Sequence, residues 1–251
     1  MIFSFTERKE TAILNFSKRS YQKELLDRDD IPFDDIKQNM RELDFINQYL
    51  GGHKITIAGF KAISGKIKSQ QKSDGQKISV CEIGCGGGDN LRVLKRYCEK
   101  KKIASEFSGI DINPHCIEFA RSRIENQNIQ FFTSDYKQVT FEQKPDIVFC
   151  SLFTHHFNDS EIIDILKWMN ENSTAGFFIN DLHRHPLAYY SIKWLTAIFS
   201  KSYLVKNDAC LSVLRGFKKK ELKSFRSQSS LLNLQFKWKW AFRWLLIYSN
   251  E

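Results

Sequence analysis

The chain has 251 residues, of which 42% are hydrophobic and 27% are charged, a balance that is ordinary for one large globular α/β domain with additions. Early charged residues argue against a signal peptide, no stretch is long enough to span a membrane, and the six cysteines lack the paired spacing of zinc sites, so we expect a cytoplasmic protein with free thiols. The formal charge of +9 arises in residues 182–251, where 13 lysines and arginines stand against 3 acidic residues. This excess permits weak contact with a membrane surface, but a solvated helix face is the simpler interpretation.

A helical prefix is expected before the main domain. Apolar residues recur at spacings of three and four between about residues 10 and 68, interrupted by Ile31-Pro32 and Gly51-Gly52. A polar connection follows. We therefore divide the chain into a helical prefix or lid over residues 1–76 and an α/β domain over residues 77–251, with a helical insertion at about 185–230.

From residue 77 onward, short β-type runs alternate with amphipathic segments. Such alternation predicts a parallel sheet with helices on both faces. Two final runs, at residues 231–236 and 241–248, bring the total to about seven strands, so we expect a doubly wound, mostly parallel, Rossmann-like sheet. The earlier strands are expected at residues 78–83, 107–112, 129–134, 146–153 and 176–181, and the helices between and after them at 89–101, 114–126, 159–170 and 185–202.

The loop after the first expected strand reads EIGCGGGD. Ligands of doubly wound sheets bind beyond the carboxyl ends of the strands, where this loop lies. Glycine lets the backbone approach a ligand, and the next helix begins with unpaired N–H groups. The spacing differs from the dinucleotide fingerprint G-x-G-x-x-G, because it is tighter and follows a carboxylate. The residues of this loop with an expected cofactor contact are Glu82, Gly84, Cys85, Gly86 and Gly88.

The pattern E-x-G-x-G-x-G resembles motif I of the class I methyltransferases that depend on S-adenosylmethionine (SAM). The resemblance covers about residues 78–181 and implies SAM as the cofactor. It also implies that the bare loop lies against the amino acid part of SAM, with Glu82 organising its ammonium group.

Two further carboxylates end the next two expected strands. Asp111 is placed to accept hydrogen bonds from both hydroxyls of a ribose. Asp135 resembles the acidic residue with which this family contacts the adenine amino group, and Ile112 and Tyr136 are candidate walls around the ring. The fourth strand also matches a motif of the family, which implies that Ser151 is a backbone neighbour of SAM.

A closer resemblance concerns the acceptor. The runs ELLDRDDIPFDDIKQNMRELDFINQYLGG, SLFTHHF, INDLHRHPLAYY and DACLSVLRGFKKKEL resemble a bacterial subgroup associated with type III polyketide synthases and phenolic natural-product pathways. This implies methylation of a hydroxyl on a small hydrophobic, phenolic or polyketide-like acceptor. The alternatives are C-methylation of a quinone-type lipid precursor and a non-catalytic SAM-binding scaffold. We expect no nucleic-acid partner, because no module or motif for one is recognised.

Three histidines follow the fourth and fifth expected strands. A hydroxyl acceptor must lose its proton, and histidine titrates in the useful range. Adjacent side chains in an extended segment point apart, so only one of His155 and His156 is expected to face the acceptor. We favour His156 as the base, and then His183. The alternative is that these histidines only bond to loop backbone.

No metal is expected. Asp181 and Asn180 are suggestive, but the sequence offers no convincing third ligand. We expect Asp181 to fix His183 or Arg184 instead.

An apolar stripe follows the fifth expected strand at helical spacing. Such a stripe is most often plain core. Its place beside the acceptor site leads us to expect that part of it lines a pocket closed by the lid, suited to an aromatic or acyl-bearing molecule. The stripe consists of Leu187, Tyr190, Trp194, Leu195, Ile198 and Phe199.

Overall fold

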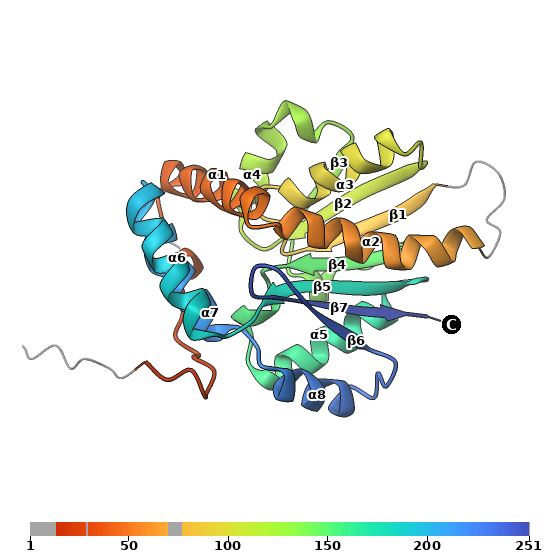
Figure 1. Cartoon of the computed structure of the whole chain (residues 1–251). Coiled ribbons are helices and arrows are strands. Elements are labelled where there is room, and N and C mark those ends of the chain that lie inside the picture. Colours follow the sequence, from red (N-terminus) through yellow and green to blue (C-terminus); the bar gives the residue numbers. More distant parts are fainter. Residues whose placement is uncertain (1–13, 29, 70–76, 251) are drawn as a thin grey trace, which may run out of the picture.

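A seven-stranded sheet forms the centre of the computed structural model, which describes residues 14–28, 30–69 and 77–250. The strands are β1 (Ile78–Ile83), β2 (Ser105–Asp111), β3 (Ile129–Thr133), β4 (Ile147–Ser151), β5 (Gly176–Leu182), β6 (Gln235–Lys239) and β7 (Arg243–Ser249). Their order is β3-β2-β1-β4-β5-β7-β6 (Figure 1). The first five pair in parallel, and β7 runs antiparallel to both β5 and β6. The expected doubly wound, mostly parallel sheet is confirmed.

The sixth strand begins later than its apolar pattern predicts. Leu231 and Leu234 are buried, yet they precede the strand. The N–H of Leu234 donates to the carbonyl of Leu231 over 2.9 Å, which closes a turn. The apolar pattern here therefore reflects packing against the sheet, and the prediction of a strand over 231–234 was wrong.

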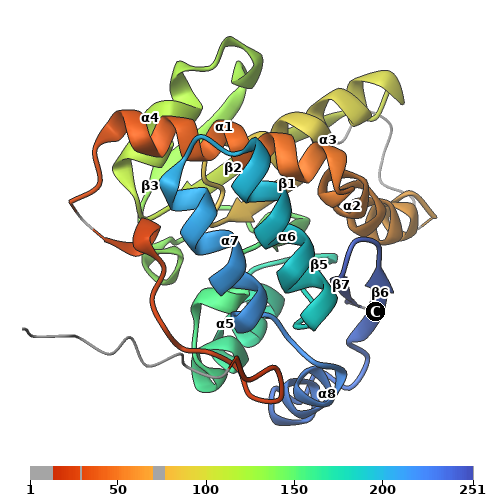
Figure 2. The ribbon, with the colours of Figure 1, turned by 60° about the vertical axis from the view of Figure 1, so that its left-hand side comes forward.

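Helices cover both faces of the sheet and one of its ends. On one face lie α2, α3 and α4, on the other α5 and α8. Figure 2 shows α1, α6 and α7 together across the carboxyl ends of the strands. Within the described ranges, no helix combines the length and apolarity needed to cross a bilayer. The helices are α1 (Phe33–Tyr49), α2 (Gly52–Ser69), α3 (Asp89–Lys100), α4 (Pro114–Ser122), α5 (Asp159–Glu171), α6 (Pro186–Phe199), α7 (Tyr203–Arg215) and α8 (Lys219–Gln228).

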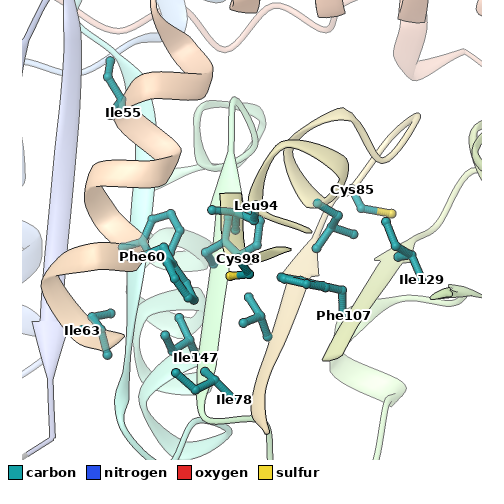
Figure 3. Packing of buried hydrophobic residues seen from close by; sticks show 14 of the residues in the cluster. Ile55, Phe60, Ile63, Ile78, Cys85, Leu94, Cys98, Phe107, Ile129 and Ile147 are labelled. Atoms are coloured by element: carbon teal, nitrogen blue, oxygen red, sulfur yellow. The ribbon is translucent and has the colours of Figure 1, made fainter. Parts of the chain in front are cut away.

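One of the two main core clusters lies under α2 and α3 (Figure 3). Phe60 and Ile63 of α2 and Leu94 of α3 are fully buried against strand residues that include Phe107 and Ile147. Burying each large apolar side chain contributes about 1.5–3 kcal/mol, so this cluster accounts for much of the stability of the sheet.

Helix α2 belongs to the expected prefix but packs directly on the sheet. Its contacts reach β5 and β7, two of the last strands in the order. Gly59 allows α2 to pack closely on β5, because a Cβ at this position would lie 2.4 Å from the Cδ2 atom of Phe178. The chain before residue 77 therefore supplies part of the core, and the domain boundary proposed there stays a prediction.

Replacing Gly59 by alanine tests this contact. Alanine normally stabilises a helix relative to glycine, but here its methyl group overlaps the Phe178 ring, and we expect Gly59→Ala to lower the free energy of unfolding by about 1–3 kcal/mol. Gly65 is the matched control on the same helix, because nothing lies within 4 Å of its added Cβ. Gly65→Ala should stabilise by about 0.5–1 kcal/mol. Urea denaturation of both variants measures this, and equal effects would contradict the packing.

Candidate active site

A cavity of about 640 Å³ lies beyond the carboxyl ends of β1, β2 and β3. The topology of the sheet brings these ends together, because the three strands are parallel neighbours. The cavity is wide enough for a nucleoside-sized cofactor. Five residues with an expected cofactor contact line it, namely Gly84, Asp111, Ile112, Asp135 and Tyr136.

Backbone geometry and a carboxylate fix the glycine loop. Gly84 and Gly86 have φ angles of +65° and +49°, which side-chain-bearing residues rarely adopt. A Cβ at Gly84 would also lie 2.1 Å from the ring of Phe153. The carboxylate of Asp111 accepts hydrogen bonds from the N–H groups of Gly86 (2.8 Å) and Asn113 (2.9 Å). Burial raises the pKa of Asp111 against the effect of these donors.

Glu82 stands behind the loop rather than in the wall of the cavity. It is buried, and its Oε1 atom accepts a hydrogen bond of 3.0 Å from the side chain of Asn90. Its Oε2 atom is buried without a hydrogen-bond partner among the described residues. Burial, together with the nearby carboxylates of Asp89 and Asp111, raises the pKa of Glu82 well above its ordinary value. A cationic group brought next to Oε2 would supply the missing partner and favour the ionised form.

The remaining residues of the loop shape it from outside the cavity. Cys85 is buried, and burial raises the pKa of its thiol well above the ordinary value. Gly88 caps the amino end of α3 and packs on Phe131. Asp135, at the far end of the cavity, also accepts the N–H of Lys137 over 3.0 Å and so caps a short turn.

A second cavity of about 350 Å³ adjoins the first. Leu26 and His156 line both, so the two cavities meet at these side chains. Ser151, which we expected beside the cofactor, lines the second cavity. The walls of the second cavity come mainly from α1, α6, α7 and the turn between β6 and β7, the elements gathered at one end of the sheet in Figure 2. The apolar lining includes Met40, Leu43, Ile46, Leu50, Ile192, Leu195 and Val213.

Only one of the residues predicted for the apolar stripe on α6 lines the second cavity. Leu195 lines the cavity, as do Ala188 and Ile192, which the stripe did not include. Helix α6 is apolar on both sides, so the 3.6-residue periodicity could not tell which side is covered. The other five residues of the stripe are exposed, namely Leu187, Tyr190, Trp194, Ile198 and Phe199.

His155 is held between two carboxylates at the wall of the second cavity. Its side chain is 2% exposed. Its Nδ1 atom lies 2.7 Å from Asp181 Oδ1, and its Nε2 atom lies 3.4 Å from Glu24 Oε1. Burial opposes protonation, but the two carboxylates outweigh it and raise the pKa of His155 to about 9. The hydroxyl of Thr154 donates to Asp181 over 2.6 Å and fixes the pair.

His156 lies beside His155 rather than opposite to it. The two rings have centroids 4.4 Å apart, and both side chains line the second cavity. The expectation that these adjacent side chains point apart was wrong, because Thr154–His156 form a 3₁₀ turn with about 120° between successive side chains instead of an extended segment. Which histidine faces an acceptor stays a prediction. His156 Nδ1 lies 3.3 Å from Asp27 Oδ1, and Nε2 lies 3.8 Å from Glu24 Oε2.

The partner expected for Asp181 was wrong as well. Asp181 contacts His155, while the guanidinium of Arg184 donates to Glu221 over 2.6 Å. His183 lines neither cavity, and its Nδ1 accepts a hydrogen bond of 3.2 Å from Trp238 Nε1. Burial and neighbouring positive charges lower its pKa.

Arg215 holds the histidine turn and the N-terminal segment together. Its guanidinium donates to the carbonyls of His155 (2.9 Å), His156 (2.5 Å) and Gln22 (2.5 Å). The segment that carries Glu24 and Asp27 is thereby placed against the strand ends. Sequence reasoning gave these two acidic residues no role, because their partners are distant in sequence. The helical pattern expected from about residue 10 was also wrong here, since the described residues before α1 contain only the 3₁₀ turn Leu25–Asp27.

Comparisons with known proteins agree with this architecture. Residues 80–176 match the family model described as a methyltransferase domain. A malonyl-acyl-carrier-protein O-methyltransferase of Acetivibrio thermocellus is 30% identical over 83 residues, which make up 33% of this chain and 28% of that protein. A candidate protein N5-glutamine methyltransferase of Methanocaldococcus jannaschii is 28% identical over 149 residues, 58% of this chain and 73% of that protein. The chain thus matches little more than a quarter of the first of these relatives.

Among solved structures, the plantazolicin methyltransferase BpumL, in complex with a monoazolic desmethylPZN analog and SAH, has a TM-score of 0.61 to this chain. The two sequences are 15% identical, and the match covers 87% of this chain and 89% of that chain. At this identity the likeness shows the fold, a Rossmann-like sheet flanked by helices. The narrower resemblance to the polyketide-associated subgroup stays a prediction.

The buried pair of Asp181 and His155 can be tested by its effect on stability. Asp181→Asn leaves a buried imidazole without its closest carboxylate, and breaking such a pair costs about 3–5 kcal/mol. Asp30, which is paired with Arg28 and exposed together with it, is the control, and Asp30→Asn should leave the free energy of unfolding nearly unchanged. Chemical denaturation of both variants measures the free energy of unfolding. Similar decreases in the two variants would show that the buried pair stabilises the fold no more than an exposed one.

Proposed function

We propose that this chain is a SAM-dependent methyltransferase that transfers the methyl group to a hydroxyl of a small hydrophobic acceptor. The methyltransferase-domain match of residues 80–176 and the class I sheet support the reaction type, and SAM is the cofactor of that type. The observation that carries the proposal is the junction of two cavities at Leu26 and His156. A cofactor in the first cavity can present its methyl group to an acceptor in the second.

The transfer itself is an in-line displacement. The bond from the acceptor oxygen to the methyl carbon forms as the bond from carbon to sulfur breaks, and the electron pair of that bond stays on sulfur. The sulfonium thus becomes a neutral thioether, S-adenosylhomocysteine. Holding the two reactants in line supplies about 7–11 kcal/mol of the barrier. Walls from α1, α6 and α7 serve this end, because they restrict the acceptor and exclude water.

The acceptor proposed for the second cavity is phenolic or polyketide-like. Its lining is largely apolar, which suits an aromatic or acyl-bearing molecule. The hydroxyl proton passes to the histidine turn, and His156 is the proposed recipient. His155 already carries a proton between two carboxylates, and His183 lies outside both cavities.

Binding of SAM is the first test. SAM at millimolar concentration should raise the melting temperature of the wild type, because a ligand that binds only the folded state stabilises it. Asp111→Asn should remove the shift, since this carboxylate lines the cofactor cavity and holds the loop at Gly86. Asp164→Asn, an exposed substitution on α5, is the control and should keep it. A wild type that gives no shift, and no heat in calorimetry, would sink the proposal.

Proton release on SAM binding is the second test. Glu82 has a raised pKa in the free protein, and the ammonium group of SAM would favour its ionised form, so binding should release a proton. Because SAM prefers the deprotonated carboxylate, affinity should rise with pH up to the raised pKa of Glu82 and level off above it. Calorimetry in buffers of different ionisation enthalpy measures the release. Glu82→Gln should remove most of it, and equal heats in all buffers for the wild type would refute this role.

A further inference from the structure

The imidazoles of His155 and His156 and the carboxylate of Glu24 converge on the second cavity. His155 Nε2 lies 3.4 Å from one oxygen of Glu24, and His156 Nε2 lies 3.8 Å from the other. One ligand atom from each residue lies within 4.8 Å of the other two. All three side chains line the cavity.

These separations are longer than hydrogen bonds and close to the spacing of two ligands on one cation. Hydrogen bonds from nitrogen to oxygen measure about 2.7–3.2 Å. His155 Nε2 has no hydrogen-bond partner among the described residues, although its side chain is only 2% exposed. Zinc bonds of about 2.0–2.2 Å in tetrahedral geometry put two ligand atoms about 3.3–3.6 Å apart. The unpartnered nitrogen therefore faces the place that a cation would take.

Neighbouring residues hydrogen-bond to the side chains of the cluster in the way that outer residues support the ligands of a metal site. A metal-binding histidine usually donates its other ring N–H to a carboxylate, which fixes the tautomer. His155 Nδ1 has such a partner in Asp181, at 2.7 Å, and Asp181 is itself held by the N–H of Leu182 at 2.8 Å. Glu24 accepts a hydrogen bond of 2.6 Å from the hydroxyl of Ser212. A cation would displace the proton that His155 carries in its absence, and with Nδ1 as the donor to Asp181 it is Nε2 that then offers its lone pair.

The chain offers an internal contrast. His53 also lies between two carboxylates, those of Asp44 and Asp89, but it does not line the second cavity. There, however, His53 Nε2 is only 2.9 Å from Asp89 Oδ2, an ordinary hydrogen-bond distance, and Arg92 pairs with Asp44. That cluster already has its partners.

We propose that Glu24, His155 and His156 bind one divalent cation, and that the acceptor oxygen takes an open coordination position on it. Two imidazoles and one carboxylate are typical donors to catalytic zinc, and manganese and ferrous iron also accept related sets. The metal site stands on its own geometry, whereas its task rests on the proposed function. With the cation bound, both imidazoles are ligands and the cation takes over the task that the proposed function gives to His156. Zinc lowers the pKa of a bound oxygen, so the acceptor hydroxyl loses its proton to solvent as it binds, before the cavity is closed to water and the methyl group is transferred.

Metal titration tests the proposal. The wild type, dialysed against EDTA and then freed of it, is titrated with ZnCl₂ by calorimetry, and we expect one tight equivalent. Glu24→Gln and His156→Gln should each weaken zinc binding by about 100-fold or more, since they remove a ligand, whereas a supporting residue costs about 10–100-fold. His53→Gln is the matched control and should leave affinity unchanged. Cobalt(II) in place of zinc should give the visible bands of a four-coordinate site in the wild type and the control only.

Two results would overturn the proposal. One is a wild type that binds no zinc, manganese or iron(II) above the background of a protein without the cluster. The other is zinc binding that survives Glu24→Gln and His156→Gln but is lost in His53→Gln. Each sample is also titrated with SAM. SAM binding shows that the variant is folded, and it tests the proposed function independently of the metal. Intact SAM binding without metal binding rejects the cation alone, and absent SAM binding rejects the proposed function while the zinc result still decides the site.

Discussion

The buried contact of His155 with Asp181 and Glu24 joins parts of the chain that would otherwise lie apart. Asp181 belongs to the fifth strand of the sheet, His155 to the turn after the fourth, and Glu24 to the N-terminal segment. Breaking one partner in such a group leaves a charge buried without compensation. The N-terminal segment is thus held over the carboxyl edge of the sheet, and this holds Leu26, which lines both cavities, in place.

The sheet and the helices at its end form different cavities. The parallel strands deliver Gly84, Asp111 and Asp135 to one edge, which positions the cofactor cavity. Helices α1, α6 and α7 then enclose a mostly apolar space beside it. In the proposed function the reacting groups meet at His156, which lines both cavities. Substitutions that alter the helices can therefore change the acceptor without changing the cofactor, in keeping with function residing in sites added to a common fold.

The position of the first cavity was predictable because it depends on local signals. Glu82 lies next to the end of β1 and Asp111 ends β2, and the strand order of this fold fixes how strand ends meet, so a cavity lies where the sequence placed the cofactor site. The contacts of these residues with a cofactor stay a prediction. The acceptor side depends on contacts between distant segments. Glu24 precedes a 3₁₀ turn in a stretch that the apolar pattern assigned to a helix, and nothing local indicates that it reaches His155. The direction of the two adjacent histidines failed for a smaller reason, because a 3₁₀ turn replaced the extended backbone that the pattern suggested.

The central claim is that an acceptor in the second cavity receives a methyl group from SAM in the first. Mass spectrometry of reactions with trideuteromethyl SAM and a panel of phenols and polyketide-like compounds tests it most directly, compared between the wild type and Ala209→Phe, which fills the second cavity. The account predicts a deuterated methyl product on oxygen with the wild type and none with Ala209→Phe, while SAM binding is equal in both. A product formed equally well by the variant, or a label found on carbon, would contradict it.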